Sequence, residues 1–252
     1  MKTSSIKRIT FVFVTVFTIF LIWELISLSK NNEIIYPSIF TIFERIFSEL
    51  KNLKNIGIIL LIIPKVLLVV LISALIAILI GYLYYLLPSS IYFIRPLIVI
   101  LKVAPFASIA VYVIMAVSRA SAPYVLTFFV SLPIIMEGLI SSVDNIDRGI
   151  KDDLELLNVS KFRKYLSVVF PLIINNFITT ILQVFGLGIK TMIMGEYLCS
   201  KDNTIGGILY AYKSSLGYDY ILAWLIIIVF VCSIIDLIIR LINKRINKMI
   251  IN

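Results

Sequence analysis

Residues 58–86 have the sequence IILLIIPKVLLVVLISALIAILIGYLYYL, and this stretch decides the fold class. It is apolar for longer than the roughly 20 residues that a helix needs to cross the hydrocarbon core of a bilayer. It does not alternate between apolar and polar positions, as the strands of a membrane barrel do. The stretch therefore predicts a transmembrane helix.

The composition of the whole chain supports this prediction. Of its 252 residues 61% are hydrophobic, and the mean hydropathy is +1.07. The formal net charge is +9, but the basic residues flank apolar stretches and form no single stripe, which argues against nucleic acid as a partner. The chain contains no histidine, so imidazole catalysis and imidazole metal ligands are excluded. Cys199 and Cys232 are too far apart in sequence for a metal-binding motif.

Six apolar stretches are long enough to span a membrane, with ends defined to within a few residues. They cover Ile9–Leu28, Ile58–Leu86, Ile91–Val117, Pro123–Ile140, Pro171–Met194 and Tyr220–Ile242. We predict an all-α fold, a polytopic transmembrane helical bundle that forms one domain over residues 1–252. The first stretch lacks a small-residue cleavage pattern, which favours an uncleaved anchor over a signal peptide.

The basic flanks predict the orientation of these helices. An even number of spans places both termini on one side of the membrane. That side has more basic residues than the other, including Lys2, Lys7, Arg8, Arg240, Lys244, Arg245 and Lys248. By the positive-inside rule, both termini are predicted to be cytoplasmic.

Residues 38–52 predict an amphipathic helix between the first two spans, on the outer side. Ser38 is a suitable N-cap. The predicted apolar stripe consists of Ile39, Ile42, Phe43, Ile46, Phe47 and Leu50, and the predicted charged face of Glu44, Arg45, Glu49 and Lys51. The helix serves either as a connector that shields the bundle or as a contact for a partner.

A charged loop, residues 146–170, separates the fourth and fifth spans and is followed by Pro171. Its first part has apolar residues at helical spacing: Ile146, Ile150, Leu154 and Leu157. Asn158, which tolerates the left-handed conformation, is predicted to end this helix, and Ser160 to cap a second one with Phe162, Leu166 and Val169 on one face. The periodicity fits a docking surface and a lipid-surface helix with solvated charges equally well.

Three ionisable residues lie inside the predicted spans: Lys102, Glu137 and Lys190. Charges are costly there, so these residues are candidates for a substrate path, and the two cations suit an anion. They alternatively pair with acids or extend to an interface. Lys65 lies closer to a predicted span end and is expected to be interfacial.

The charged loop resembles the EAA loop of permease subunits of bacterial ABC importers. Asp152-Asp153-Leu154 stands at the Glu-Ala-Ala positions, Asn158 at the glycine and Pro171 at the proline, with the family's spacing. The shorter acid and the bulkier Leu154 are departures from the motif.

Other segments resemble the nitrate/sulfonate/taurine type of permease in particular. Tyr36-Pro37-Ser38 is similar to its Leu-Pro-Ser, and Leu101–Pro105 to its Leu-Arg-Pro-x-Pro. Gly195–Leu198, with Gly206–Leu209, is similar to its Ala-Glu-x-x and Gly-Leu-Gly segments.

The resemblance implies a function. The chain would be a non-catalytic permease in the bacterial inner membrane, acting with a second copy, a cytoplasmic ABC ATPase and an extracytoplasmic substrate-binding protein. Asp152, Asp153, Leu154 and Asn158 would dock the ATPase. This chain would hold no cofactor, since ATP and magnesium would bind the partner ATPase. Residues 186–191 are the nearest approach to a phosphate-binding loop, but no glycine stands directly before Lys190.

Two alternatives from other classes remain open. An ion-coupled secondary transporter would need its own ion site and usually shows repeated halves, which the sequence lacks. A membrane scaffold would use the charged loop only to recruit a cytoplasmic protein.

Overall fold

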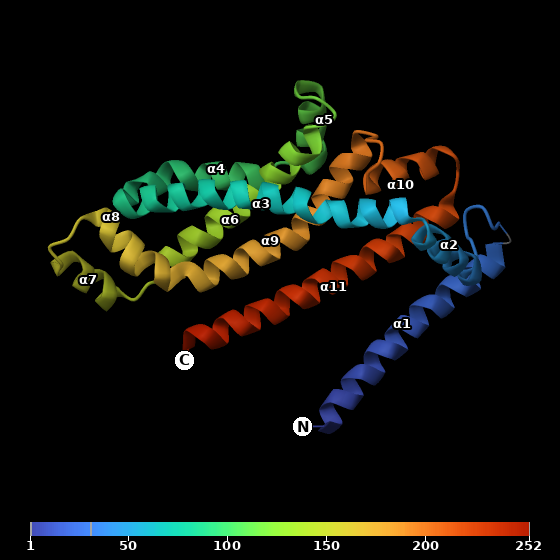
Figure 1. Ribbon diagram of the computed structural model, residues 1–252, viewed down its shortest axis with the longest axis horizontal. Coiled ribbons are helices and arrows are strands. Elements are labelled where there is room, and N and C mark those ends of the chain that lie inside the picture. Colours follow the sequence, from blue (N-terminus) through green and yellow to red (C-terminus); the bar gives the residue numbers. More distant parts are fainter. Residues whose placement is uncertain (1, 31, 252) are drawn as a thin grey trace. The chain divides into compact units, whose positions relative to one another are not determined.

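The computed structural model describes the backbone of residues 2–30 and 32–251 (Figure 1). Side chains are described for residues 10, 11, 14–30 and 32–241, so the predicted basic flanks Lys2, Lys7, Arg8, Lys244, Arg245 and Lys248 lie outside the described side chains. The helices are α1 (Lys2–Lys30), α2 (Ile39–Lys51), α3 (Leu53–Leu86), α4 (Ile91–Val103), α5 (Phe106–Ala116), α6 (Ala122–Asp144), α7 (Arg148–Leu156), α8 (Lys161–Lys164), α9 (Phe170–Leu198), α10 (Ile205–Ser214) and α11 (Tyr218–Ile251). A 3₁₀ turn, η1 (Pro88–Ser90), precedes α4, and a π-helical turn, η2 (Tyr165–Val169), joins α8 to α9. The all-α prediction is confirmed for this described part.

Four helical segments are long and apolar enough to cross a membrane: Leu53–Leu86, Ala122–Asp144, Lys161–Leu198 and Tyr218–Leu241. The bent pair of Pro88–Val103 and Phe106–Ala116 gives a fifth if it counts as one span. The predicted first span lies within α1, part of whose side chains are outside the described residues. The described part of the chain thus has four to five candidate spans, and six stays a prediction.

The span predicted over Ile91–Val117 is bent at its middle, and whether it crosses the membrane as one span stays a prediction. α4 and α5 meet at an angle of 95°. Pro105 lacks the N–H that would continue the helix, and proline disfavours helical backbone at the residue before it. Ala104 accordingly has an extended ψ of 129°. In Figure 1, α5 turns away from the line of α4.

The chain folds into two compact units. One comprises residues 1–57 and 208–230, and the other residues 58–207 and 231–252. Whether residues 1–252 act as a single functional domain stays a prediction.

In the first unit, the end of α1 holds the start of α2. The carboxylate of Glu24 accepts a hydrogen bond from the Ile39 N–H at 2.9 Å, and Trp23 donates to the Pro37 carbonyl at 3.0 Å. The Ser38 hydroxyl accepts from the Thr41 N–H, which confirms the predicted N-cap. The helix therefore begins where the sequence predicts.

The faces of α2 differ from the prediction. Glu49, expected on the charged face, is only 7% exposed, and Ile42 is the one buried residue of the predicted apolar stripe. Phe43 and Phe47 are exposed. Glu49 is buried because donors distant in sequence satisfy its carboxylate, and the exposed apolar side chains suit a helix that lies against lipid.

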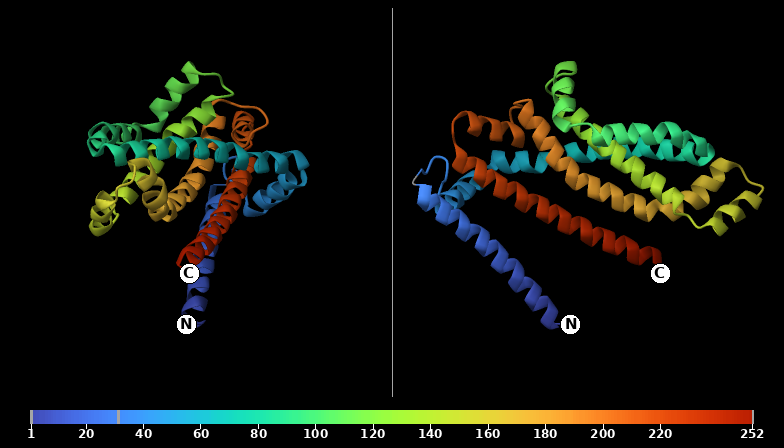
Figure 2. Two further views of the ribbon diagram at one scale, coloured as in Figure 1. Left: turned by 60° about the vertical axis from the view of Figure 1, so that its left-hand side comes forward. Right: turned by 180° about the vertical axis from the view of Figure 1, so that it is seen from behind.

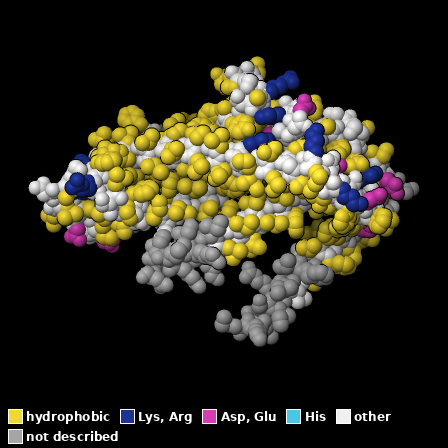
Figure 3. All heavy atoms as spheres, in the orientation of Figure 1, with side chains coloured by type: hydrophobic (Ala, Val, Ile, Leu, Met, Phe, Trp, Pro, Cys, Tyr) yellow, Lys and Arg dark blue, Asp and Glu magenta, His cyan; other side chains and the backbone are white. Residues whose placement is uncertain are grey.

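In the second unit, α6 and α9 lie side by side, as the views in Figures 1 and 2 agree. The two helices bury Leu126, Ile135 and Leu139 of α6 and Ile173, Ile189 and Met192 of α9, each at most 1% exposed. α4 and α5 also pack on α6. Figure 3 shows apolar side chains along these long helices and charged side chains at the end that carries α7 and α8. This arrangement places the charged loop at one end of the unit.

Candidate functional site

The charged loop forms the predicted helix–turn–helix. Asp147 caps α7 by accepting a hydrogen bond from the Gly149 N–H at 2.7 Å. The chain then turns, and Ser160 accepts from the Arg163 N–H at 3.4 Å, which confirms the predicted second cap. Two side-chain caps thus define the loop's shape.

The end of α7 differs from the prediction. α7 ends at Leu156, and Leu157 leaves it in an extended conformation with ψ 124°. Among the described residues other than glycine, only Ser200, Asn203 and Leu216 have positive φ. The helix thus ends two residues before Asn158, and the extended linker turns the chain without a left-handed residue there.

The second helix of the loop is not separate from the fifth span. α8 continues through η2 into α9, so residues 161–198 form one long helix. The Phe170 N–H donates to the Tyr165 carbonyl, five residues earlier. Pro171 follows directly, and a π turn makes room for a proline ring that an α-helical turn would crowd.

The docking candidates of α7 divide by exposure. Asp152, Asp153 and Asn158 are exposed, whereas Leu154 is 6% exposed. Leu154 thus holds α7 against the unit, and the two acids beside it in the sequence are exposed.

Aromatic side chains pack the loop against the end of α3. Tyr165 is buried and packs against Tyr82 and Tyr85 of α3, with ring centroids 5.1 and 5.4 Å apart. Phe162 meets the Tyr82 ring edge-on at 5.6 Å. Aromatic contacts of this kind add to the free energy of burial. They attach the start of the long α8–α9 helix to the end of α3.

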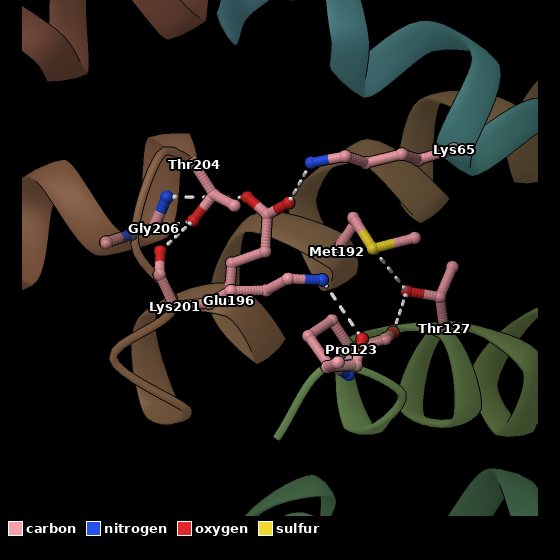
Figure 4. Close-up of polar contacts among 10 residues, drawn as sticks. Lys65, Pro123, Thr127, Met192, Glu196, Lys201, Thr204 and Gly206 are labelled. Atoms are coloured by element: carbon pink, nitrogen blue, oxygen red, sulfur yellow. Dashed lines mark hydrogen bonds and ion pairs between the residues drawn. The ribbon is translucent and has the colours of Figure 1, made fainter. Parts of the chain in front are cut away.

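An ion pair with a buried carboxylate and a half-buried lysine lies elsewhere in the same unit (Figure 4). Glu196 of α9 is 1% exposed and accepts from Lys65 Nζ of α3 at 2.8 Å. Its second oxygen lies 3.5 Å from the Gly206 N–H at the start of α10. A Cβ on Gly206 would stand 2.2 Å from the Tyr197 nitrogen, so only glycine permits this close approach. The pair joins three helices.

Sequence reasoning misses this ion pair. Lys65, which the sequence predicts to be interfacial, is neutralised by Glu196, and its place relative to the membrane stays a prediction. Two signals existed: a lysine within an apolar stretch, and a glutamate in a segment similar to the permease pattern. Their spacing along the chain does not show that they meet.

The predicted substrate-path residues are not brought together as a set. Lys102 of α4 forms an ion pair with Glu137 of α6, and both side chains are exposed. Lys190 is exposed on α9, and its side chain makes no hydrogen bond or ion pair with a described residue. The pairing with an acid, which the sequence left open, holds for Lys102 alone.

The first unit contains a second buried carboxylate. Glu49 accepts hydrogen bonds from Asn55 Nδ2 at 2.9 Å, Tyr212 OH at 2.7 Å and Trp224 Nε1 at 2.8 Å. Burial, together with the hydrogen bond to Glu49, raises the pKa of the Tyr212 phenol. Three uncharged donors thus hold a carboxylate at the junction of four helices.

A surface ion pair lies beside this carboxylate. Arg45 donates to Asp219 at 2.7 Å, and this hydrogen bond raises the pKa of the guanidinium. The same guanidinium stands 4.7 Å from the centre of the Tyr220 ring, which stacks on Tyr212 at 4.5 Å. These contacts join α2 to α10 and α11 within the unit.

The comparisons with known proteins identify the family. A family model described as "Binding-protein-dependent transport system inner membrane component" matches residues 73–248. The match includes the charged loop, Glu137 and Glu196, and excludes Lys65 and Glu49. No match to the chain is found among the curated proteins. Because the matched segment is well over half of its length, the chain belongs to the family of inner membrane components of binding-protein-dependent transport systems.

Proposed function

We propose that this multi-pass membrane protein, a permease component of an ABC importer by its family, docks a separate cytoplasmic ATPase through α7. The carrying observation is the pair of exposed acids, Asp152 and Asp153, on a short helix fixed by the buried Leu154. Such a helix presents its charged side chains to a partner while the side chain of Leu154, which fixes the helix, stays buried. Asn158 adds an exposed polar group at the turn, and Leu154 acts by holding α7 in place.

The long helix behind α7 suits the transmission of motion. Residues 161–198 form one continuous helix of 38 residues, about 57 Å long at a rise of 1.5 Å per residue. The aromatic contacts of Tyr165 attach its first turns to α3. A displacement of the start of this long helix would therefore move packed helices as a body.

The proposed topology has six spans. α1 supplies the first and the bent pair α4–α5 the third, and both termini are cytoplasmic. The bend at Pro105 supports a path through the membrane, because non-helical backbone at that depth is tolerated where it is buried in protein or lines a water-filled cavity. A second copy of the chain and an extracytoplasmic binding protein complete the importer.

The proposed substrate is a small solute, with anions such as a sulfonate or nitrate as candidates. Lys102 and Glu137 neutralise one another, so they give little preference for an anion. Lys190 is the remaining candidate cation of the path. The nitrate/sulfonate/taurine subtype rests on the sequence resemblance.

ATP and magnesium are proposed to bind only the partner ATPase. Residues 186–191 lie within α9. A phosphate loop needs irregular backbone with free N–H groups, which a continuous helix does not offer. This chain is therefore proposed to be non-catalytic.

Reconstitution tests the proposal. Proteoliposomes that contain the chain together with its ATPase and binding protein should take up solute only when ATP is supplied. Vesicles with the chain alone should take up none under any ion gradient. Ion-driven uptake by the chain alone would establish a secondary transporter, and ATPase recruitment without uptake would establish a scaffold.

A further inference from the structure

A cavity of about 420 Å³ lies beside α7 in the second unit. The end of α3, the end of α6, α7 and α8 all contribute to its wall. The volume is within the usual range for small-molecule sites, roughly 300–1,000 Å³. The cavity is therefore large enough for a polar headgroup rather than a single ion.

The charges that face this cavity are unequally compensated. Asp144 accepts a hydrogen bond from Tyr84 OH at 2.5 Å and lies 3.8 Å from Arg95. Lys151 donates to the Asp144 carbonyl at 2.9 Å.

Two further lysines of the wall have no partner. The side-chain ammonium groups of Lys161 and Lys164 make no hydrogen bond or ion pair with any described residue. Glu155 is the remaining acid of the wall. Two lysines against one acid leave an excess of positive charge.

The rest of the wall is apolar and aromatic. Tyr84 and Tyr85 line one side, and Leu86, Pro88 and Val143 belong to the same wall. All of these residues except Pro88, which begins η1, lie at the ends of the candidate spans Leu53–Leu86 and Ala122–Asp144. Tyrosines and lysines at span ends typically face the headgroup layer of a bilayer.

We propose that this cavity binds the phosphate ester of an anionic phospholipid headgroup, held by Lys161 and Lys164. The glycerol part would lie against Leu86 and Pro88. Basic pockets between membrane helices bind anionic headgroups in this way. The proposal is independent of ATPase docking, since it needs only this chain and lipid.

Lipid titration tests the proposal on the full chain in a neutral detergent. Native mass spectrometry would measure bound phosphatidylglycerol against phosphatidylcholine at equal concentration. K161Q/K164Q should weaken the phosphatidylglycerol complex about 30-fold, from roughly 1 kcal/mol for each lysine. K161R/K164R keeps both charges and should bind as the parent does. P88W narrows the cavity without changing charge and should also weaken binding.

The matched control is K51Q/K54Q, which removes two exposed lysines of the same spacing outside the cavity. It should leave binding within twofold, and circular dichroism would verify that each variant is helical. Equal losses in both double variants, or no loss in K161Q/K164Q, would overturn the proposal. The last measurement adds soluble glycerol phosphate as a competitor of phosphatidylglycerol. Failure to compete would support a phospholipid as the ligand. Competition at the concentration at which the lipid binds would overturn the proposal that the ligand is a lipid.

Discussion

The acids of α7 and the two buried glutamates all carry a carboxylate, but they differ in their exposure to solvent. Asp152 and Asp153 are exposed, whereas Glu49 and Glu196 are 7% and 1% exposed and fully engaged. A buried carboxylate survives only with partners, so its partners define the fold around it. An exposed carboxylate contributes little to that fold and is available to another molecule. The difference separates residues that hold the structure from those proposed to act.

The two buried glutamates also differ from each other. Glu196 is held by a cation, Lys65, and Glu49 by the uncharged donors of Asn55, Tyr212 and Trp224. Loss of one partner therefore leaves an uncompensated charge in the first case. At Glu49, loss of one partner leaves a buried hydrogen-bond donor or acceptor unsatisfied.

Lys65→Met should have the largest effect on stability. It leaves Glu196 buried without its cation, which should lower the free energy of unfolding by about 3–5 kcal/mol. Unfolding in mixed detergent micelles measures this change. K65M/E196Q should recover much of the loss, because the uncompensated charge is then gone. A loss below about 1 kcal/mol in K65M would show that the pair does not hold the fold.

Glu49→Ala should have the next largest effect. It removes the acceptor of three donors, each worth about 1 kcal/mol, so the loss should be about 3 kcal/mol. Glu44→Ala, an exposed acid of the same helix, is the matched control and should change stability by less than about 0.5 kcal/mol. Equal effects of the two variants would show that Glu49 does not stabilise the fold through its buried hydrogen bonds.

The raised pKa of Tyr212 predicts a response to alkaline pH. The folded state keeps this phenol protonated at a pH where the unfolded chain releases the proton. Stability should be constant below the ordinary tyrosine pKa of about 10 and fall as pH rises above it. Melting temperatures from about pH 8 to about pH 11 would measure the fall. Tyr212→Phe should make this fall less steep, and Tyr92→Phe, at an exposed position, should leave it unchanged.

The double variant D152K/D153K should have the smallest effect on stability. Both side chains are exposed, so the free energy of unfolding should stay within about 0.5 kcal/mol of the parent. The same unfolding assay measures it. A loss as large as that of E49A would mean that these acids belong to the fold after all.

Local sequence patterns predict the helices well, but they predict poorly which side chains form hydrogen bonds or ion pairs with one another. Apolar length and the caps Ser38 and Ser160 are local signals, and the structure confirms them. Glu49 is missed because helical spacing places it among charged neighbours, while two of its donors, Tyr212 and Trp224, come from the far end of the chain.

Two backbone features also escape prediction for physical reasons. A proline in an apolar stretch either starts, bends or breaks a helix, and packing decides which. Pro105 accompanies a break of 95°, whereas Pro171 is accommodated by a π turn in a continuous helix. Composition alone does not distinguish these outcomes.

Co-purification of the ATPase with the charged-loop variants tests the central claim most directly. The chain carrying D152K/D153K should insert and fold normally but no longer retain the ATPase through affinity purification. The control E44K/D202K changes the same number of exposed acids outside α7 and should retain it. Full retention by D152K/D153K, at the parent's stoichiometry, would contradict docking through α7.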